Sequence, residues 1–206
     1  MSSDKKTDQT NIYNAEIVAG SLLIPESRKI AHLLIKSVDK TKWHQAVIVD
    51  NILQKRSPAA AKRQTKLIRN RLELMEPEFW ALVTKGSSDV ITQSLLAAAI
   101  KHNRFLGDFM DKIIREHWRT FTPKISNKDW ETLFETCAQI EPDILEWSKT
   151  TMSKLRQVIF RILAEAKYID GTRSLKLLPV SIVPEVHQYL KKHQEHYVLR
   201  CMEVTI

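Results

Sequence analysis

A run of cationic side chains is the feature of this sequence best suited to chemistry. Seven Lys and Arg residues lie between Lys55 and Arg71, and no Asp or Glu occurs from Asn51 to Leu72. An ordinary exposed helix mixes its charges, because Glu–Lys pairs four residues apart stabilise it and like charges destabilise it. Cations of one sign bind anions such as the phosphates of nucleic acids. The run therefore predicts an anion-binding surface, and the alternative is a solvated face that happens to be basic.

This cationic run is predicted to lie on one helix. Ser57 is a good N-cap, Pro58 is a good first helical residue, and Pro77 limits the helix to about residue 75. With about 100° per residue, one face collects the side chains expected to pack on the core, namely Ala61, Gln64, Thr65, Ile68, Leu72 and Met75. Arg71 lies at the margin of that stripe, where its stem is expected to pack while its head reaches solvent.

The other side of the predicted helix supplies the first set of candidate binding residues. An Arg or Asn on a helix in the major groove of duplex DNA reads base edges, while Lys contacts phosphate. Residues just before the helix lie near its positive N-terminal end, which suits a phosphate. The predicted nucleic-acid-binding residues of this first basic surface are Lys55, Arg56, Lys62, Arg63, Lys66, Arg69 and Asn70.

A second basic surface is predicted near the C-terminus, on a helical pattern at about 143–168 and on the turn that follows it. Its candidate nucleic-acid-binding residues are Lys149, Lys154, Arg156, Arg161, Arg173 and Lys176. Glu146 and Glu165 interrupt the cations of this segment, so a solvated face explains it as readily as an anion-binding one.

Other chemically capable residues favour structural roles. His193 and His196 are three residues apart, a spacing that can hold a metal, but Lys191 and Lys192 precede them and no acidic or Cys ligand completes a site. No metal site is therefore predicted. The five Trp residues have apolar neighbours, which favours packing at helix crossings over stacking on bases.

The sequence gives no sign of an enzyme. Asp108 and Asp111 share a predicted helix face and have Lys112 and Arg115 four residues on, which predicts ordinary surface ion pairs. No phosphate-binding loop, nucleophile elbow, zinc-protease or dinucleotide-binding motif is present. We expect no catalytic residues and no cofactor.

Composition places these surfaces on a helical globular protein. Gly (four residues) and Pro (seven) are scarce in 206 residues, and 43% hydrophobic content suffices for a core. The net charge of +8 favours anionic partners. No apolar run approaches the roughly 20 residues that span a bilayer. Residues 1–11 are polar and predict a short disordered tail without a signal peptide, so we expect a cytoplasmic protein.

The order of predicted elements divides the chain into two subdomains. Three short helices, the third of them basic, predict a helix-turn-helix-like unit over residues 12–76. Residues 77–206 predict a helical subdomain, because apolar helical patterns follow one another to a final helix that starts at Pro184. Between its last two helices, the segment at about 174–183 predicts a short β-hairpin like the wing of a winged helix.

Several segments in order along the chain resemble the BrxA family of the BREX bacterial phage-defence systems. The resemblance runs from Tyr13 to the C-terminus and lies in YNAEIVAGSLLIPESRKIAHLL, DNILQKRSPAAAKRQTKLIRNRLELM, LAAAIKHNRFLGDFM, EWSKTTMSKLRQVIFRILAEAKYID and EHYVLRCMEV. It implies a compact, mainly α-helical bundle similar to NusB, with helix-turn-helix-like parts that bind double-stranded DNA. It also implies no catalytic activity.

The residues and the resemblance lead to one expected function and one alternative. We expect a non-enzymatic protein of a BREX-type defence system that binds double-stranded DNA, with other defence proteins as further partners and no membrane contact. The alternative is an adaptor of the NusB-like kind, in which the basic helix docks RNA or an acidic protein.

Overall fold

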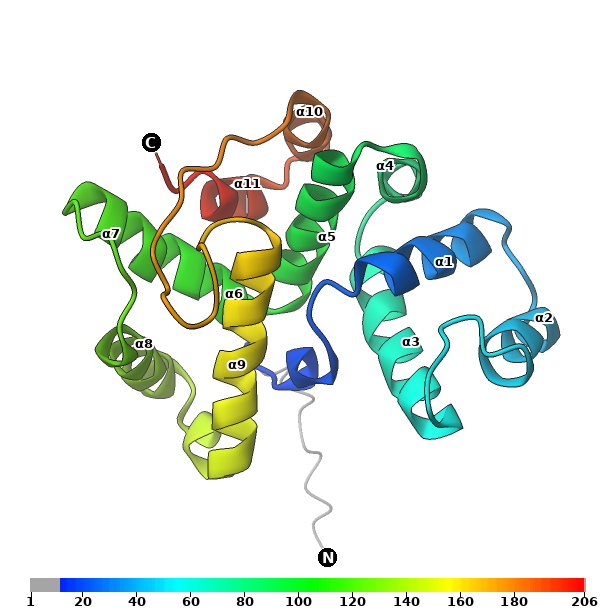
Figure 1. Ribbon diagram of the computed structural model, residues 1–206, viewed down its shortest axis with the longest axis horizontal. Coiled ribbons are helices and arrows are strands. Elements are labelled where there is room, and N and C mark those ends of the chain that lie inside the picture. The colour runs from blue at the N-terminus through cyan, green and yellow to red at the C-terminus, as the bar shows by residue number, and fades with distance from the viewer. Residues whose placement is uncertain (1–11, 206) are drawn as a thin grey trace, which may run out of the picture.

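The computed structural model describes residues 12–205, and within that range every regular element is a helix (Figure 1). The predicted tail at 1–11 lies outside the described residues. In chain order, with η marking 3₁₀ and π segments, the elements are η1 (Glu16–Ala19), α1 (Ile24–Ile35), α2 (Lys40–His44), η2 (Gln45–Val49), α3 (Pro58–Glu73), α4 (Phe79–Lys85), α5 (Ser88–His102), α6 (Arg104–Asp108), η3 (Phe109–Ile114), α7 (Arg115–Arg119), α8 (Asn127–Ile140), η4 (Pro142–Glu146), α9 (Lys149–Glu165), α10 (Pro184–Lys192) and α11 (His196–Met202). The predicted mainly α-helical bundle is confirmed.

Two of the first three helices, α2 and α3, start at a side-chain cap. The Asp39 carboxylate accepts a hydrogen bond from the backbone N–H of Lys42 at 2.8 Å and caps α2. The Ser57 hydroxyl accepts one from the backbone N–H of Ala60 at 3.2 Å and caps α3. Each cap satisfies an amide that has no partner within its helix. The predicted basic helix is thus present, and its use in a helix-turn-helix stays a prediction.

The apolar helix α5 lies at the centre of the packing. Its residues 95–100 are almost completely buried, and it packs against α1, α3, α4, α10 and α11. One cluster of buried apolar side chains extends from Tyr13 to Val204, so it runs through both of the predicted subdomains. The division at residue 76 stays a prediction about independent units. No helix within 12–205 has the length and apolar character needed to cross a membrane.

Two helix boundaries differ from the predicted ones, and one helix was not predicted. The pattern at 143–168 gives a 3₁₀ turn followed by α9, which starts only at Lys149 because Ser148 caps it. The final helix is broken into α10 and α11 near Gln194, whose φ of 55° is left-handed. Helix α4 was not predicted, and no side chain caps its start; it forms because Phe79 and Val83 are buried.

The predicted β-hairpin at about 174–183 is not formed. The segment makes two isolated bridges, one from Lys176 to Lys124 and one from Leu177 to Ile169. Its backbone therefore pairs with the α7–α8 connection and with the residues that follow α9. No two parts of the segment pair with each other as the strands of a hairpin would. Pro179, which lacks an amide hydrogen, follows Leu178, whose amide donates to the Tyr168 carbonyl at 3.0 Å.

Arg71 is buried, which corrects the prediction that its head reaches solvent. Its side chain is 4% exposed, and it donates hydrogen bonds to the carbonyls of Ser21 at 2.5 Å and Gly20 at 3.1 Å. From α9, the Glu165 carboxylate accepts from the Ser21 hydroxyl at 2.7 Å and from the Leu22 amide at 3.0 Å. The helical periodicity of residues 58–75 did not predict this arrangement, because a distant segment, the connection between η1 and α1, covers the margin of α3 where Arg71 lies.

Burial lowers the pKa of the Arg71 guanidinium to about 10, and the Glu165 carboxylate opposes that shift. The side chain therefore stays charged at neutral pH. A buried cation is tolerated only when hydrogen bonds and an opposite charge compensate for the loss of water. The two carbonyls and Glu165 supply this compensation and join α3, the η1–α1 connection and α9.

Asp108 and Asp111 are also buried, although ordinary surface pairs were predicted for them. Asp108 is 2% exposed and accepts hydrogen bonds from the hydroxyls of Tyr13 at 2.8 Å and Tyr197 at 2.9 Å. Asp111 pairs with Arg115 and also with Arg200 of α11 at 2.6 Å. The pairs to residues four positions on exist as predicted, but partners from distant segments cover both carboxylates.

Replacing Arg71 by Met should lower the free energy of unfolding by about 3–5 kcal/mol, because it leaves two carbonyls and the Glu165 charge without their cationic partner. Urea denaturation followed by circular dichroism measures the change. Arg63→Met is the matched control on the same helix, since Arg63 is exposed, and it should change stability by at most about 0.5 kcal/mol. Equal effects of the two substitutions would show that Arg71 contributes no more than a surface residue.

Asp108→Asn should destabilise the protein in a pH-dependent way. Burial by itself raises the pKa of Asp108, but hydrogen bonds from Tyr13, Lys112 and Tyr197 outweigh it and hold the pKa below its ordinary value. A carboxyl with a depressed folded-state pKa stabilises the fold above its unfolded pKa of about 3.9, and this contribution is lost as the pH falls through the folded pKa.

The deficit of Asp108→Asn should therefore be about 1–3 kcal/mol at neutral pH and should shrink as the pH falls below about 4. Urea titrations across this pH range measure it. Asp89→Asn is the control, because its ion pair with Lys167 lies in solvent and is worth little. A deficit that is constant with pH would contradict the assignment of a charged carboxylate.

Candidate nucleic-acid interface

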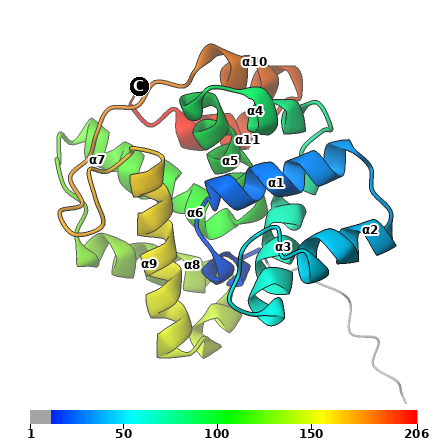
Figure 2. The same cartoon turned by 45° about the vertical axis from the view of Figure 1, so that its right-hand side comes forward.

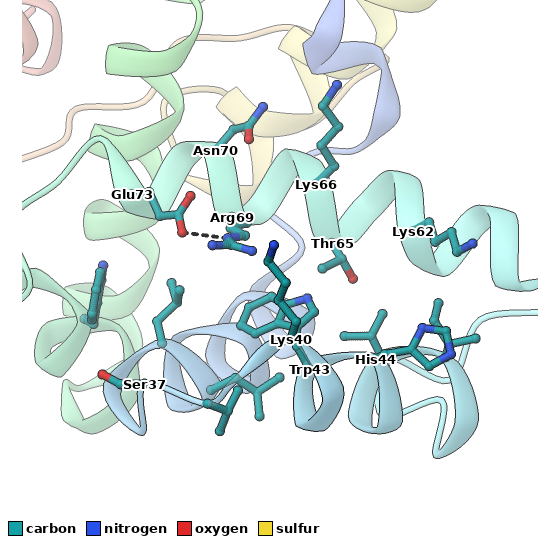
Figure 3. Close-up of a pocket in the computed structure, with 16 residues that line it drawn as sticks. Ser37, Lys40, Trp43, His44, Lys62, Thr65, Lys66, Arg69, Asn70 and Glu73 are labelled. Atoms are coloured by element: carbon teal, nitrogen blue, oxygen red, sulfur yellow. Dashed lines mark hydrogen bonds and ion pairs between the residues drawn. The ribbon is translucent and has the colours of Figure 1, made fainter.

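Apart from the buried Arg71, helix α3 keeps its cationic side chains outside the core, and three of them, Lys62, Lys66 and Arg69, are drawn in Figure 3. Lys62, Arg63, Lys66 and Arg69 are exposed, and Asn70 beside them is half-buried. The face predicted to pack on the core does so through its buried residues Ala61, Thr65, Ile68 and Leu72. Leu67 is buried as well, so the exposed part of α3 is a narrow ridge.

The cations of this ridge differ in how far they are already paired. Within residues 12–205, no ion pair engages Lys62, Arg63 or Lys66. Arg69 by contrast pairs with Glu73 at 2.6 Å, and its guanidinium carbon lies 4.9 Å from the centre of the Trp43 ring. A phosphate would therefore compete with a carboxylate and a cation–π contact at Arg69, but only with water at the other three.

The two predicted binding residues before α3, Lys55 and Arg56, differ in how far they are exposed and paired. The Lys55 ammonium pairs with Glu26 of α1 at 2.5 Å, and both side chains are only 18% exposed. The backbone of Lys55 is also held, since its amide donates to the Asn51 side chain at 2.9 Å. Lys55 thus holds the connection between η2 and α3 against α1, whereas Arg56 is exposed.

A groove of about 900 Å³ runs between α3 and the first two helices (Figure 3). Aliphatic side chains and two Trp rings line its interior, and cations line its edge. The residues are Leu33, Leu34, Ser37, Val38, Lys40, Trp43, His44, Val47, Ile48, Lys62, Thr65, Lys66, Arg69, Asn70, Glu73 and Trp80. The sequence prediction had assigned Trp43 to packing and had not included Lys40, although KTKWH shows cations beside an aromatic residue.

The second basic surface is built around α9. Lys149, Lys154 and Arg161 are exposed on this helix. Arg156 is half-buried and donates a hydrogen bond to the side-chain oxygen of Asn127, at the start of α8, at 3.0 Å. Arg156 is therefore partly committed to holding α8 and α9 together.

Two loops add further cations to this second surface. Backbone hydrogen bonds from Ile125 to the Leu175 carbonyl (3.0 Å) and from Leu177 to the Pro123 carbonyl (2.9 Å) fasten the α7–α8 connection to the segment after α9. Lys124 and Lys176 are thereby bridged, and Arg173 shares a small cavity with Lys124 and Asn127. Lys124 was missed, because nothing local to it predicts this long-range contact.

The short helix η1 lies between the two basic helices. It packs against α3 on one side and α9 on the other, as both views of the chain show (Figures 1 and 2). The second surface is thus separated from the first by η1, so the structure does not merge the two predicted sets into one site.

Three other groups that could carry chemistry are engaged in the fold or buried. His193 pairs with Glu78, and no cluster of three potential metal ligands occurs in the part of the chain that the structure describes. Burial raises the pKa of the Cys201 thiol to about 12 and that of Cys137 above its ordinary value. Both thiols are therefore protonated at neutral pH and poor nucleophiles.

Comparison with known proteins identifies relatives over nearly the whole chain. A relative from Paramagnetospirillum magneticum (strain ATCC 700264 / AMB-1), named BREX protein BrxA, is 45% identical over 194 residues, which cover 94% of this chain and 98% of the relative. Another of the same name, from Escherichia coli O9:H4 (strain HS), is 29% identical over 188 residues, covering 91% and 88%.

A solved structure shares the fold as well as the sequence. The crystal structure of an uncharacterized protein from Magnetospirillum magneticum superposes with a TM-score of 0.87 at 43% identity, covering 94% of this chain and 100% of that one. The BrxA family model matches residues 11–194. The chain therefore belongs to the BrxA family.

Proposed function

We propose that this protein serves a BREX phage-defence system by binding double-stranded DNA, without catalytic activity of its own. Relatives named BREX protein BrxA support the place in BREX, because they align over almost the full chain. The observation that carries DNA binding is the exposed ridge of α3, where Lys62, Arg63 and Lys66 have no acidic partner within the described residues.

The chemistry of the ridge matches a duplex. Cations without partners release condensed counterions when they neutralise phosphates, which supplies most of the affinity for DNA. A helix of ordinary width fits the major groove, where Asn70 can pair with an adenine edge and Arg63 with a guanine edge. The second basic surface contributes further phosphate contacts from Lys154, Arg161 and Arg173.

Arg69 and Lys55 have smaller roles in this proposal than the sequence suggested. Arg69 is held by Glu73 and Trp43, and Lys55 by Glu26. Their existing contacts would have to be given up for a phosphate, which offsets the gain from binding it.

A non-catalytic role is supported by the state of the acidic residues. Asp108 and Asp111, which the sequence places on one helix face, are buried and engaged in ion pairs. A general base must reach the proton that it abstracts. These two carboxylates face protein partners, so we assign them to stability and propose no cofactor.

The alternative function is an adaptor that docks RNA or an acidic protein on the basic helix. The groove beside α3 favours this alternative, because Trp43 and Trp80 line it and neither aromatic ring is needed for phosphate binding. Single strands stack their bases on such rings, whereas a duplex keeps its bases paired.

Arg63→Ala/Lys66→Ala should weaken duplex binding and reduce its salt dependence. Each phosphate contact contributes about −0.9 to the slope of log K against log salt, so losing two should make the slope shallower by about 2. Fluorescence anisotropy with one duplex, its single strand and the matching RNA at several salt concentrations measures both quantities. Preference for the single strand or the RNA would favour the adaptor.

The matched control is Lys85→Ala/Lys191→Ala, which removes the same charge from exposed positions off both basic surfaces. It should leave the slope nearly unchanged, because net charge acts weakly beyond the Debye length of about 10 Å. A third pair, Lys154→Ala/Arg161→Ala, reports on α9. If only this pair changes the slope, the α3 ridge is a solvated face; if no nucleic acid binds, the proposal is wrong.

A further inference from the structure

An exposed apolar and acidic patch lies at the junction of α8 and η4. Ile140 is 51% exposed and Leu145 is 64% exposed, which is unusual for side chains of this size. Asp143 and Glu146 beside them are exposed, and neither takes part in an ion pair within residues 12–205. We name these four residues the η4 patch.

The groove beside α3 has the complementary character. Its interior is aliphatic, through Leu33, Val47 and Ile48, and its edge carries Lys40, Lys62 and Lys66. These three ammonium groups have no acidic partner in the described part of the chain. Aliphatic surface with cations around it suits an apolar segment flanked by carboxylates.

One polar atom inside the groove also lacks a partner. Thr65 is 6% exposed, lines the groove and points toward α1 and α2 (Figure 3). Its hydroxyl oxygen makes no hydrogen bond within the described residues. A buried hydroxyl without a partner costs free energy, and an occupant that offers it a polar group removes this cost.

We propose that the groove beside α3 receives the η4 patch of a second copy of this chain. Leu145 and Ile140 would enter the aliphatic interior, while Asp143 and Glu146 would face Lys40, Lys62 and Lys66. A duplex is the weaker candidate for this interior, because the sugar-phosphate backbone has no apolar side chains with which to cover Leu33, Val47 and Ile48.

The placement of the two features determines the kind of assembly. The η4 patch lies at the junction of α8 and α9, on a different side of the molecule from α2 and the groove (Figures 1 and 2). One chain therefore cannot fill its own groove. An interface between two different surfaces is heterologous, and its repetition gives a closed ring of copies if the rotation between them closes and an open chain if it does not.

This association would regulate DNA binding at the same helix. Lys62 and Lys66 belong both to the edge of the groove and to the α3 ridge. The carboxylates of a docked copy would compete with phosphate for them, so the associated form would bind DNA mainly through its α9 surface. This consequence rests on the proposed function, whereas the association itself does not.

Sedimentation velocity of the full chain tests the association. From about 1 µM to about 300 µM, where small charged interfaces associate, the mean mass should rise with concentration and fall with added salt. Ile140→Ser/Leu145→Ser removes the patch, and Lys40→Glu reverses one charge at the edge of the groove. All three changes are at exposed positions, so the fold should tolerate them.

Mixing the two variants provides the decisive measurement. Each variant alone should stay monomeric, but the mixture should form dimers and nothing larger, because only one intact patch meets one intact groove. The inference is overturned if the wild type is monomeric throughout, or if either variant associates as the wild type does. Duplex binding by a monomeric wild type would leave the proposed function standing while this inference fails.

Discussion

The fold depends on the buried charge of Arg71 and the way in which the chain compensates for it. The guanidinium holds the carbonyls of Gly20 and Ser21, while Glu165 holds the Ser21 hydroxyl and the Leu22 amide. The backbone of three residues, Gly20 to Leu22, is thus fixed between α3 and α9. Since a buried cation without partners is expensive, these three parts of the chain keep their relative positions.

This arrangement gives α3 two different roles on two sides. Its inner side carries buried residues such as Ile68 and Arg71, and its outer side keeps Lys62, Arg63 and Lys66 in solvent. A rigid inner attachment matters for binding, because phosphate contacts gain most when the cations that make them sit on a fixed element. The same attachment explains why α3 can expose like charges that would destabilise an isolated helix.

A comparable use of distant partners occurs around Asp108. Gly107 precedes it, and a side chain at that position would collide with the Tyr197 hydroxyl, so glycine allows Tyr197 to reach the carboxylate. Tyr13 reaches the same carboxylate from the start of the described chain. Asp108 therefore joins α6 to both ends of the described residues. The groove beside α3 and the η4 patch stay at the surface, each with apolar side chains that are not covered by the rest of the described chain.

Local signals predicted much of the secondary structure. Ser57 with Pro58 begins α3 as predicted, because a cap depends on residues within one turn of it. The sequence patterns did not predict features that depend on partners far away along the chain. Helix α4 forms through the burial of Phe79. The segment at 174–183 pairs with residues 124 and 169 and does not fold into the predicted hairpin.

The sequence by itself determined the helical class, the caps, the family resemblance and the exposed cations of α3, since each follows from residues close along the chain. Only the tertiary structure decided which of those cations are free. It buried Arg71 and paired Lys55 with Glu26, and it placed Arg69 over Trp43. It also created the groove and brought Lys124 to the α9 surface. The physical reason is that the burial or pairing of a side chain depends on several segments at once, whereas the periodicity of one helix describes that single segment.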